Sequence, residues 1–138
     1  MSGDPITDLL RQAKTIVVIG LTGSELRPSY GVSSYMQQQG YRIIPINPNG
    51  EEVLGEKGYK SLREIPEKVD IVDVFRRPDA VPGIVDEVIA FGKEKGTMPS
   101  LWLQETVVHE QAAEKARKAG ITVIMDQCIL KEHRKRAE

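Results

Sequence analysis

Residues 15–28 read TIVVIGLTGSELRP, an apolar run followed by a turn of small and polar residues. The β-branched residues of 15–19 predict a strand that is covered on both faces, and Gly20 ends it abruptly. A helical pattern begins at Ser29. In a strand–turn–helix unit, the backbone N–H groups of the turn and the helix N-terminus face the same point, where both favour negative charge. We therefore expect an anion-binding loop in this stretch.

Apolar runs and amphipathic segments alternate along the rest of the chain. The runs predict further strands at 41–46, 70–75, 101–103 and 121–125, and the amphipathic segments predict helices at 5–13, 29–39, 79–95 and 109–118. A short helix with Ser61 and Glu64 as a capping box is expected between them, and a solvated helix end at 131–136. The pattern predicts one domain, residues 1–138, with an α/β fold: a doubly wound, mainly parallel sheet of five to six strands with helices on both faces.

Ligands of such sheets bind beyond the carboxyl ends of the strands, where the strand order reverses. The loops expected there are 20–28, 47–51, 75–78, 104–106 and 126–128. Arg27 and Arg76 lie on two of them, where a guanidinium group would reach a phosphate in bidentate geometry. Asp73 interrupts the apolar strand before Arg76, and the sequence assigns it no role.

The composition excludes several classes of protein. The chain has 138 residues, a formal net charge of −1 and a single cysteine, Cys128. The charge provides no overall field for nucleic acid or an anionic membrane, and one cysteine cannot form an internal disulfide or a multi-cysteine metal cluster. No apolar run is long enough to span a membrane, and the first residues lack the pattern of a secretory leader. We expect a cytoplasmic location.

The first loop lacks the features of a dinucleotide site. It contains Gly20 and Gly23 but not the G-x-G-x-x-G fingerprint. The second strand ends at Ile46-Asn47, without the acid that would bind the ribose hydroxyls of NAD. No G-K-[ST] follows the first strand, so a Walker loop is excluded. The sequence thus disfavours NAD as the ligand.

Five loop motifs occur in a fixed order: TGSE at 22–25, INP at 46–48, VDVFRRP at 72–78, LWLQE at 101–105 and DQC at 126–128. This ordered set resembles the stand-alone CoA-binding proteins, which are similar to the CoA-binding N-terminal domain of succinyl-CoA synthetase alpha subunits. The resemblance implies a Rossmann-like fold and coenzyme A (CoA) as the cofactor. The catalytic histidine of the synthetase lies on a later domain without a counterpart in these residues, so no reaction is implied.

The resemblance also implies which residues hold CoA. The first turn would bind the phosphates through backbone amides and hydroxyls, the second turn would lie against the adenosine end, the third would border nucleotide and pantetheine, and the fourth would approach the far end. In chain order these residues are Gly20, Leu21, Thr22, Gly23, Ser24 and Arg27, then Asn47 and Pro48, then Phe75, Arg76 and Pro78, and finally Gln104 and Glu105. Tyr59 would pack over the ligand or form a half-buried part of the sheet edge. A lysine meets the ribose phosphate in the synthetase, and here Arg27 or Lys57 would replace it.

Cys128 has two interpretations, a thiol that meets the CoA thiol and a small buried hydrophobic residue. Glu105 and Cys128 are the only reactive side chains expected near the ligand, and no nucleophile–base–orienter set is recognisable. We expect non-catalytic binding of CoA or acyl-CoA. The alternatives are an NAD(P)-type oxidoreductase and an interaction subunit of an acyl-CoA ligase. The expected partners are thus CoA or acyl-CoA, with a homodimer or a ligase-type protein left open and with no nucleic acid, membrane or metal.

Overall fold

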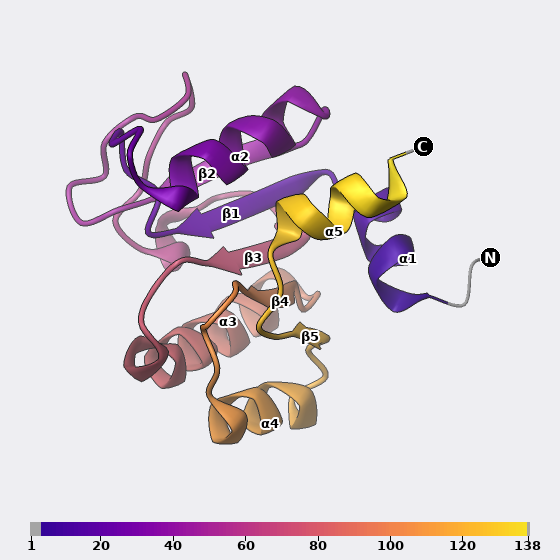
Figure 1. Ribbon diagram of the computed structural model, residues 1–138. Helices are drawn as coiled ribbons and strands as arrows, with labels where there is room; N and C mark the ends of the chain where they lie inside the picture. The colour runs from indigo at the N-terminus through magenta and orange to yellow at the C-terminus, as the bar shows by residue number, and fades with distance from the viewer. Residues whose placement is uncertain (1–3, 138) are drawn as a thin grey trace.

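In the computed structural model, which describes residues 4–137, five parallel strands form one sheet in the order β2-β1-β3-β4-β5 (Figure 1). The strands are β1 (Thr15–Ile19), β2 (Arg42–Ile46), β3 (Ile71–Val74), β4 (Ser100–Leu103) and β5 (Val123–Ile124). The helices are α1 (Pro5–Gln12), α2 (Pro28–Gln38), α3 (Val81–Lys95), α4 (Glu110–Lys118) and α5 (Ile129–Arg136), with short 3-10 helices η1 (Leu62–Glu64) and η2 (Pro78–Ala80). The prediction of a doubly wound α/β fold is confirmed.

Hydrophobic clusters on both faces of the sheet hold the helices in place. Ile16 and Val18 of β1 belong to the cluster that α1, α2 and α5 cover. Val17 and Ile19 belong to the cluster that η1, α3 and α4 cover. Figure 1 shows these two layers on opposite sides of the strands. Because every residue of β1 after Thr15 is buried, the strand requires the continuous apolar run that the sequence displays.

The strand order reverses at β1. The chain leaves β1 to form β2 on one side and then crosses to β3 on the other, with Ile19 in register with Val74. The two chains separate at Gly20 and Phe75, which places the crevice of the fold between their loops. Gly20 has φ +96°, and a Cβ built on it would lie 2.4 Å from the Phe75 carbonyl oxygen. Only glycine fits this position without a shift in the backbone.

Pro45 is accommodated because β2 lies at the edge of the sheet. The pairing of β2 with β1 continues through this proline to Ile46. On the outer side, Tyr59 N–H donates to the Pro45 carbonyl at 2.9 Å and Ile46 forms an isolated parallel bridge with Tyr59. Proline is tolerated in an edge strand because such a strand pairs with a full neighbouring strand on one side only.

Two local predictions are corrected by the structure. Ser61 makes no side-chain capping bond, and Glu64 Oε1 instead accepts a hydrogen bond from Lys60 N–H at 3.1 Å. The last strand, β5, is shorter than expected because Asp126, with φ +62°, turns the backbone away soon after it. The capping box therefore does not form, although a short helix does.

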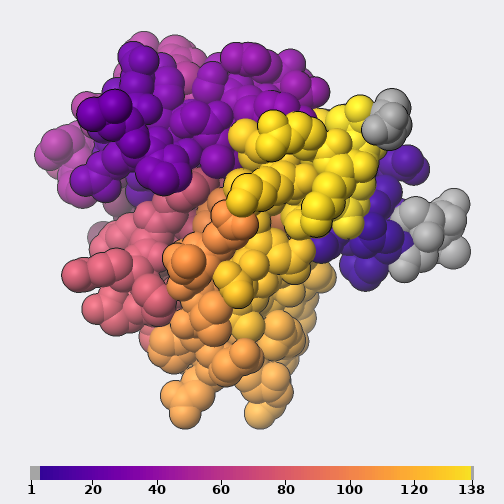
Figure 2. Space-filling view, viewed as in Figure 1, coloured from indigo at the N-terminus to yellow at the C-terminus, as the bar shows by residue number. Residues whose placement is uncertain are grey.

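The C-terminal segment is not the solvated helix end that was predicted. Ile129 of α5 is fully buried, and the Arg136 guanidinium group bonds to Asp4 Oδ2 at 2.8 Å and to Glu132 Oε1 at 3.0 Å. Tyr35 of α2 shares a 2.9 Å hydrogen bond with His133 Nδ1. Figure 2 shows the yellow C-terminal segment lying against α2 and the N-terminal segment. Basic residues surround the few buried positions of α5, and the sequence of this segment therefore resembles that of a solvated helix.

Candidate functional site

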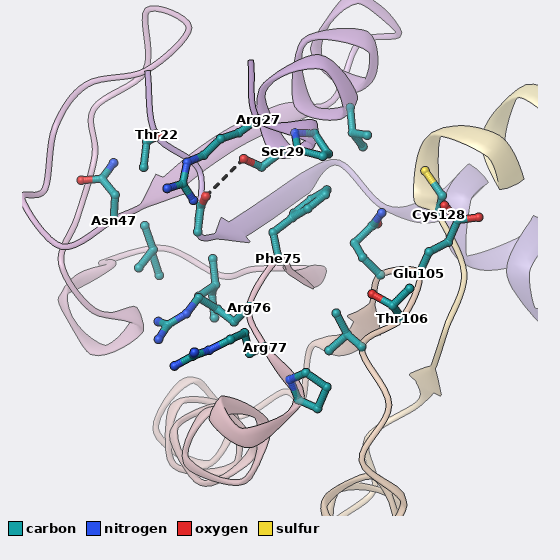
Figure 3. A pocket seen from close by; sticks show the side chains of 18 of the residues that line it. Thr22, Arg27, Ser29, Asn47, Phe75, Arg76, Arg77, Glu105, Thr106 and Cys128 are labelled. Carbon is teal, nitrogen blue, oxygen red and sulfur yellow. Dashed lines mark hydrogen bonds between the residues drawn. The ribbon is translucent and has the colours of Figure 1, made fainter. Parts of the chain in front are cut away.

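A pocket of about 970 Å³ opens at the carboxyl ends of β1 to β4 (Figure 3). It is lined by Ile19, Gly20, Thr22, Arg27, Pro28, Ser29, Val32, Ile46, Asn47, Pro48, Lys60, Phe75, Arg76, Arg77, Pro78, Gln104, Glu105, Thr106, Val107 and Cys128. Most of the predicted ligand-binding residues are in this set. In Figure 3, Thr22, Arg27 and Asn47 lie at one end of the pocket, and Glu105, Thr106 and Cys128 lie at the other. A volume of this size accommodates a cofactor.

The turn after β1 forms one wall of the pocket. Ser29 Oγ donates to the Gly20 carbonyl oxygen at 3.2 Å, which ties the start of α2 to the end of β1. Thr22 Oγ1 accepts a long bond of 3.3 Å from Ser24 N–H. The N-cap residue of α2, Arg27, provides no side-chain capping bond, so the positive end of the helix dipole is not neutralised by its own cap. This wall therefore favours a negatively charged group.

Asn47 organises the turn and does not present a free amide to the pocket. Its Nδ2 donates to the Leu21 carbonyl at 2.9 Å and to the Glu51 carbonyl at 3.1 Å, and its Oδ1 accepts from Glu51 N–H at 2.7 Å. Both amide hydrogens are thus used within the protein. The Leu21 side chain is fully buried in the core, so only its backbone is near the turn. These two predicted contacts serve the shape of the loops.

Four cationic side chains line the pocket: Arg27, Lys60, Arg76 and Arg77. Within residues 4–137, the first three form no ion pair with an acid, and Arg77 Nε lies 3.8 Å from Asp79 Oδ1 in an exposed pair. An exposed ion pair of this kind contributes little to the stability of the folded protein. The pocket therefore carries positive charge that is free to meet an anion, although the whole chain is nearly neutral.

Lys60 was not among the predicted residues, and Lys57 was. The aliphatic stem of Lys60 lies against the turn after β2. A Cβ built on Gly50 would be 3.3 Å from Lys60 Cγ. Lys57 lies instead over the Tyr59 ring, with its ammonium nitrogen 5.2 Å from the ring centroid, and does not line the pocket. The bridge between Ile46 and Tyr59 places Lys60 at the sheet edge, and no sequence pattern signals such a bridge.

Three more predicted residues lie outside the pocket lining. Tyr59 packs against the hydrophobic cluster under α3, which matches the second interpretation given to it. Gly23 and Ser24 are exposed on the turn. A Cβ on Gly23 would meet no atom within 4 Å, and its φ lies outside the left-handed region, so the fold does not require glycine at this position. The requirement for glycine belongs to Gly20.

The far end of the pocket is built by the loops after β4 and β5. Gln104 is 5% exposed, and its Oε1 accepts a hydrogen bond from Ile129 N–H at 3.1 Å. Lys131 Nζ binds Glu105 Oε2 at 2.9 Å, and this bond raises the pKa of Lys131. Thr106, which has φ +71°, donates its N–H to Asp126 Oδ1 at 2.8 Å. These cross-links hold the two loops together.

Asp73 lies in β3 on the same face of the sheet as Phe75, beneath the pocket. It is 1% exposed, and its Oδ1 has no hydrogen-bond partner among the described residues. Burial raises the pKa of this carboxyl well above its ordinary value. The neighbouring Trp102 is fully buried, and its Nε1–H donates to the Gln127 carbonyl at 2.8 Å. Asp73 is therefore a buried acid that prefers the neutral form.

The described residues offer neither a metal cluster nor a membrane-spanning helix. Across residues 4–137, no group of three or more His, Cys, Asp and Glu side chains is arranged to hold a metal ion. Within the same part of the chain, no helix has the length and apolar character needed to cross a bilayer. A second, smaller pocket of about 290 Å³ lies between α3 and α4, where His109 is among its lining residues.

Several known proteins are similar to this chain in sequence or in structure. YneT of Bacillus subtilis (strain 168) is 41% identical over 128 residues, which cover 93% of this chain and 91% of YneT. The structure of cell-free ID.343 from Thermus thermophilus has 39% identity and a TM-score of 0.86, with 94% of this chain and 95% of that chain covered. Acetate–CoA ligase [ADP-forming] II of Archaeoglobus fulgidus is 35% identical over 86 residues, which cover 60% of this chain but only 12% of the ligase.

A family profile decides the assignment that the loop motifs suggested. The profile of the CoA binding domain matches residues 14–134, which include all five strands and the loops around the pocket. The match agrees with the resemblance drawn from the order of the five loop motifs. The chain belongs to the CoA binding domain family.

Proposed function

We propose that this chain binds CoA or acyl-CoA in the pocket at the strand ends. The observation that carries the proposal is the meeting of an anion-favouring turn with three unpaired cationic side chains at the reversal of strand order. Arg27 comes from the turn after β1, Lys60 from the sheet edge and Arg76 from the loop after β3. Phosphates are the ligand groups that match this combination.

The proposal gives each part of the ligand a place. Gly20 N–H already donates to the Ile46 carbonyl and Ser24 N–H to Thr22 Oγ1, so the backbone N–H groups of 21–23 and the Thr22 hydroxyl hold the diphosphate, with Arg27 and Arg76 on either side. The ribose phosphate lies near Lys60, which lines the pocket from the turn after β2, next to Gly50. The pantetheine arm then passes Phe75 and ends near Gln104.

NAD fits this pocket less well. The end of β2 provides Asn47, whose amide hydrogens are already used, and no carboxylate stands there for the ribose hydroxyls. A phosphate on the ribose meets Lys60 instead of an acid. CoA carries such a phosphate and NAD does not, so the charge pattern favours CoA.

A role as the interaction subunit of an acyl-CoA ligase is the second candidate. The relation to an ADP-forming acetate–CoA ligase supports it, since the matching part is only 12% of that protein. On this account the chain supplies the CoA site and a cytoplasmic partner supplies the acyl chemistry. Co-purification of a ligase-type protein with the tagged chain would support this candidate over a chain that acts alone or as a homodimer.

Isothermal titration calorimetry with CoA, ADP and NAD tests the primary proposal. CoA should bind with one site per chain and more tightly than ADP, because the ribose phosphate and pantetheine add contacts. NAD should bind weakly. Saturable binding of NAD without binding of CoA would overturn the assignment.

A further inference from the structure

The amide nitrogen of Gln104 is a hydrogen-bond donor without a partner. Its Oε1 is fixed by Ile129 N–H at 3.1 Å, which sets the orientation of the amide. Within residues 4–137, Nε2 makes no hydrogen bond, and this nitrogen keeps some solvent-accessible surface. Gln104 is nonetheless 5% exposed and lines the pocket. Because Gln104 lines the pocket and its oxygen is occupied, the nitrogen is the atom of this amide left to donate to a ligand.

Cys128 stands next to this donor. It precedes Ile129, the residue that binds Gln104, and its side chain lines the same pocket while being 6% exposed. Figure 3 shows it beside Glu105 and Thr106, at the end of the pocket away from Asn47. The thiol is the N-cap side chain of α5 but makes no capping bond, so its sulfur is not engaged there. A thiol and an unpartnered donor thus line the same pocket.

A helix N-terminus and a lysine lie close to Cys128 along the chain. The N-terminus of α5 places a partial positive charge at Cys128. Lys131 lies one turn further along; the hydrogen bond to Glu105 raises its pKa, and the charge of a Cys128 thiolate adds to this in smaller measure. The thiolate is the reactive form of cysteine. Glu105 is the acid close to this group, and its carboxylate is held by Lys131.

We propose that Cys128 accepts the acyl group of acyl-CoA by thioester exchange, a step that goes beyond binding and rests on the proposed CoA site. The Cys128 thiolate attacks the thioester carbonyl carbon, and the oxygen that becomes negative accepts a hydrogen bond from Gln104 Nε2. The intermediate collapses by breaking the bond from carbon to the CoA sulfur. The products are an S-acylated Cys128 and CoA thiolate, which takes up the proton that Cys128 lost. One thioester replaces another, so no oxidant, reductant or nucleotide is needed.

Intact-mass spectrometry of the full chain incubated with acetyl-CoA tests the step. Because Cys128 is the only cysteine, one acetyl adduct that neutral hydroxylamine removes reports on it directly. The adduct should form on the folded chain faster than on the urea-unfolded chain, and it should disappear in Cys128→Ser. An adduct that resists hydroxylamine or persists in Cys128→Ser would be lysine acylation and would overturn the proposal. Equal rates for the folded and unfolded chains would do the same.

The donor has its own variant. Gln104→Glu keeps an oxygen for Ile129 N–H but removes the N–H donor, and it should slow acylation at saturating acetyl-CoA about 100-fold. Gln104→Leu is a second variant without a donor, and the exposed Gln111→Glu is the matched control that should change nothing. Saturable CoA binding without any adduct overturns this proposal and leaves the CoA assignment standing. Absence of CoA binding to the unmodified chain overturns both.

Discussion

Asn47 Nδ2 donates a 2.9 Å hydrogen bond to the carbonyl oxygen of Leu21, and this contact joins the turns that follow β2 and β1. The same side chain also closes its own turn through two bonds to the backbone of Glu51. The two turns that border the phosphate end of the pocket are thus held by one buried amide, which is 3% exposed. The shape of the turn depends on this residue even though its amide hydrogens are unavailable to a ligand.

Asn47→Ala should therefore weaken both stability and CoA binding. The variant leaves the Leu21 carbonyl, whose bond to Asn47 is buried, without this partner and removes two bonds to Glu51, which costs about 1–3 kcal/mol. Urea unfolding measures the loss, and calorimetry measures the CoA affinity. Asn49→Ala is the matched control, because Asn49 is exposed in the same turn and should behave as the unmodified chain. Equal stability of the two variants would contradict the role of Asn47.

Gly20→Ala should destabilise the fold more than Gly23→Ala. The new methyl group would meet the Phe75 carbonyl oxygen, and the left-handed backbone alone costs about 1–3 kcal/mol for a residue with a side chain. At Gly23 the space is open, so stability should change by less than about 0.5 kcal/mol. Thermal unfolding of both variants gives the comparison. A loss of CoA affinity in a fully stable Gly23→Val variant would then report on the ligand and not on the fold.

Asp73→Asn should raise the free energy of unfolding more at pH 7 than at pH 4. The folded state raises the pKa of Asp73, so the native carboxyl keeps its proton where the unfolded one, with a pKa of about 3.9, ionises. The native state is thereby favoured at low pH and loses this advantage as pH rises above the unfolded pKa. Asparagine does not titrate and loses nothing. Urea unfolding at both pH values checks the difference.

The exposed Asp79→Asn is the control for that measurement, because its side chain is 76% exposed and far from a buried environment. The stability of Asp73→Asn minus that of the unmodified chain should increase from pH 4 to pH 7. The same quantity for Asp79→Asn should stay nearly constant. A decrease for Asp73→Asn would mean that the native carboxyl is ionised and stabilising.

Lys60→Met should lower the affinity for CoA but not for dephospho-CoA, which lacks the ribose phosphate. A hydrogen bond to a charged group is worth about 1.5–3 kcal/mol, which corresponds to roughly a 10-fold to 100-fold loss. Methionine keeps the apolar stem that packs on Gly50. Lys57→Met is the matched control, because the Lys57 ammonium group lies over the Tyr59 ring. Equal losses for both ligands would place the phosphate elsewhere.

The sequence was sufficient for the parts that local pattern controls. The apolar runs around Ile16 and Val72 are buried on both faces, and this burial is what produces a continuous run in the sequence. The order of strands and helices then limits the topology, and the loops at the strand ends follow from it. The glycine at position 20 was identified in the same way, since an abrupt end of a buried run marks a turn.

Contacts between loops were beyond local pattern. Lys60 reaches the pocket through a single bridge between Ile46 and Tyr59, and Gln104 acquires its free donor only because Ile129 occupies its oxygen. Both depend on where distant loops end, which no periodicity encodes. The helix α5 was underestimated for a similar reason, because its anchoring partners lie on α1 and α2.

The account depends on phosphate binding by the turn after β1, and amide chemical shifts measured by NMR test it most directly. Titration with CoA should shift the backbone N–H signals of residues 20–24 and of Ser29, with further shifts at Arg76 and Gln104. ADP should reproduce the shifts of the turn but not that of Gln104. Shifts confined to the smaller pocket between α3 and α4, which His109 lines, with the turn unchanged, would contradict the account.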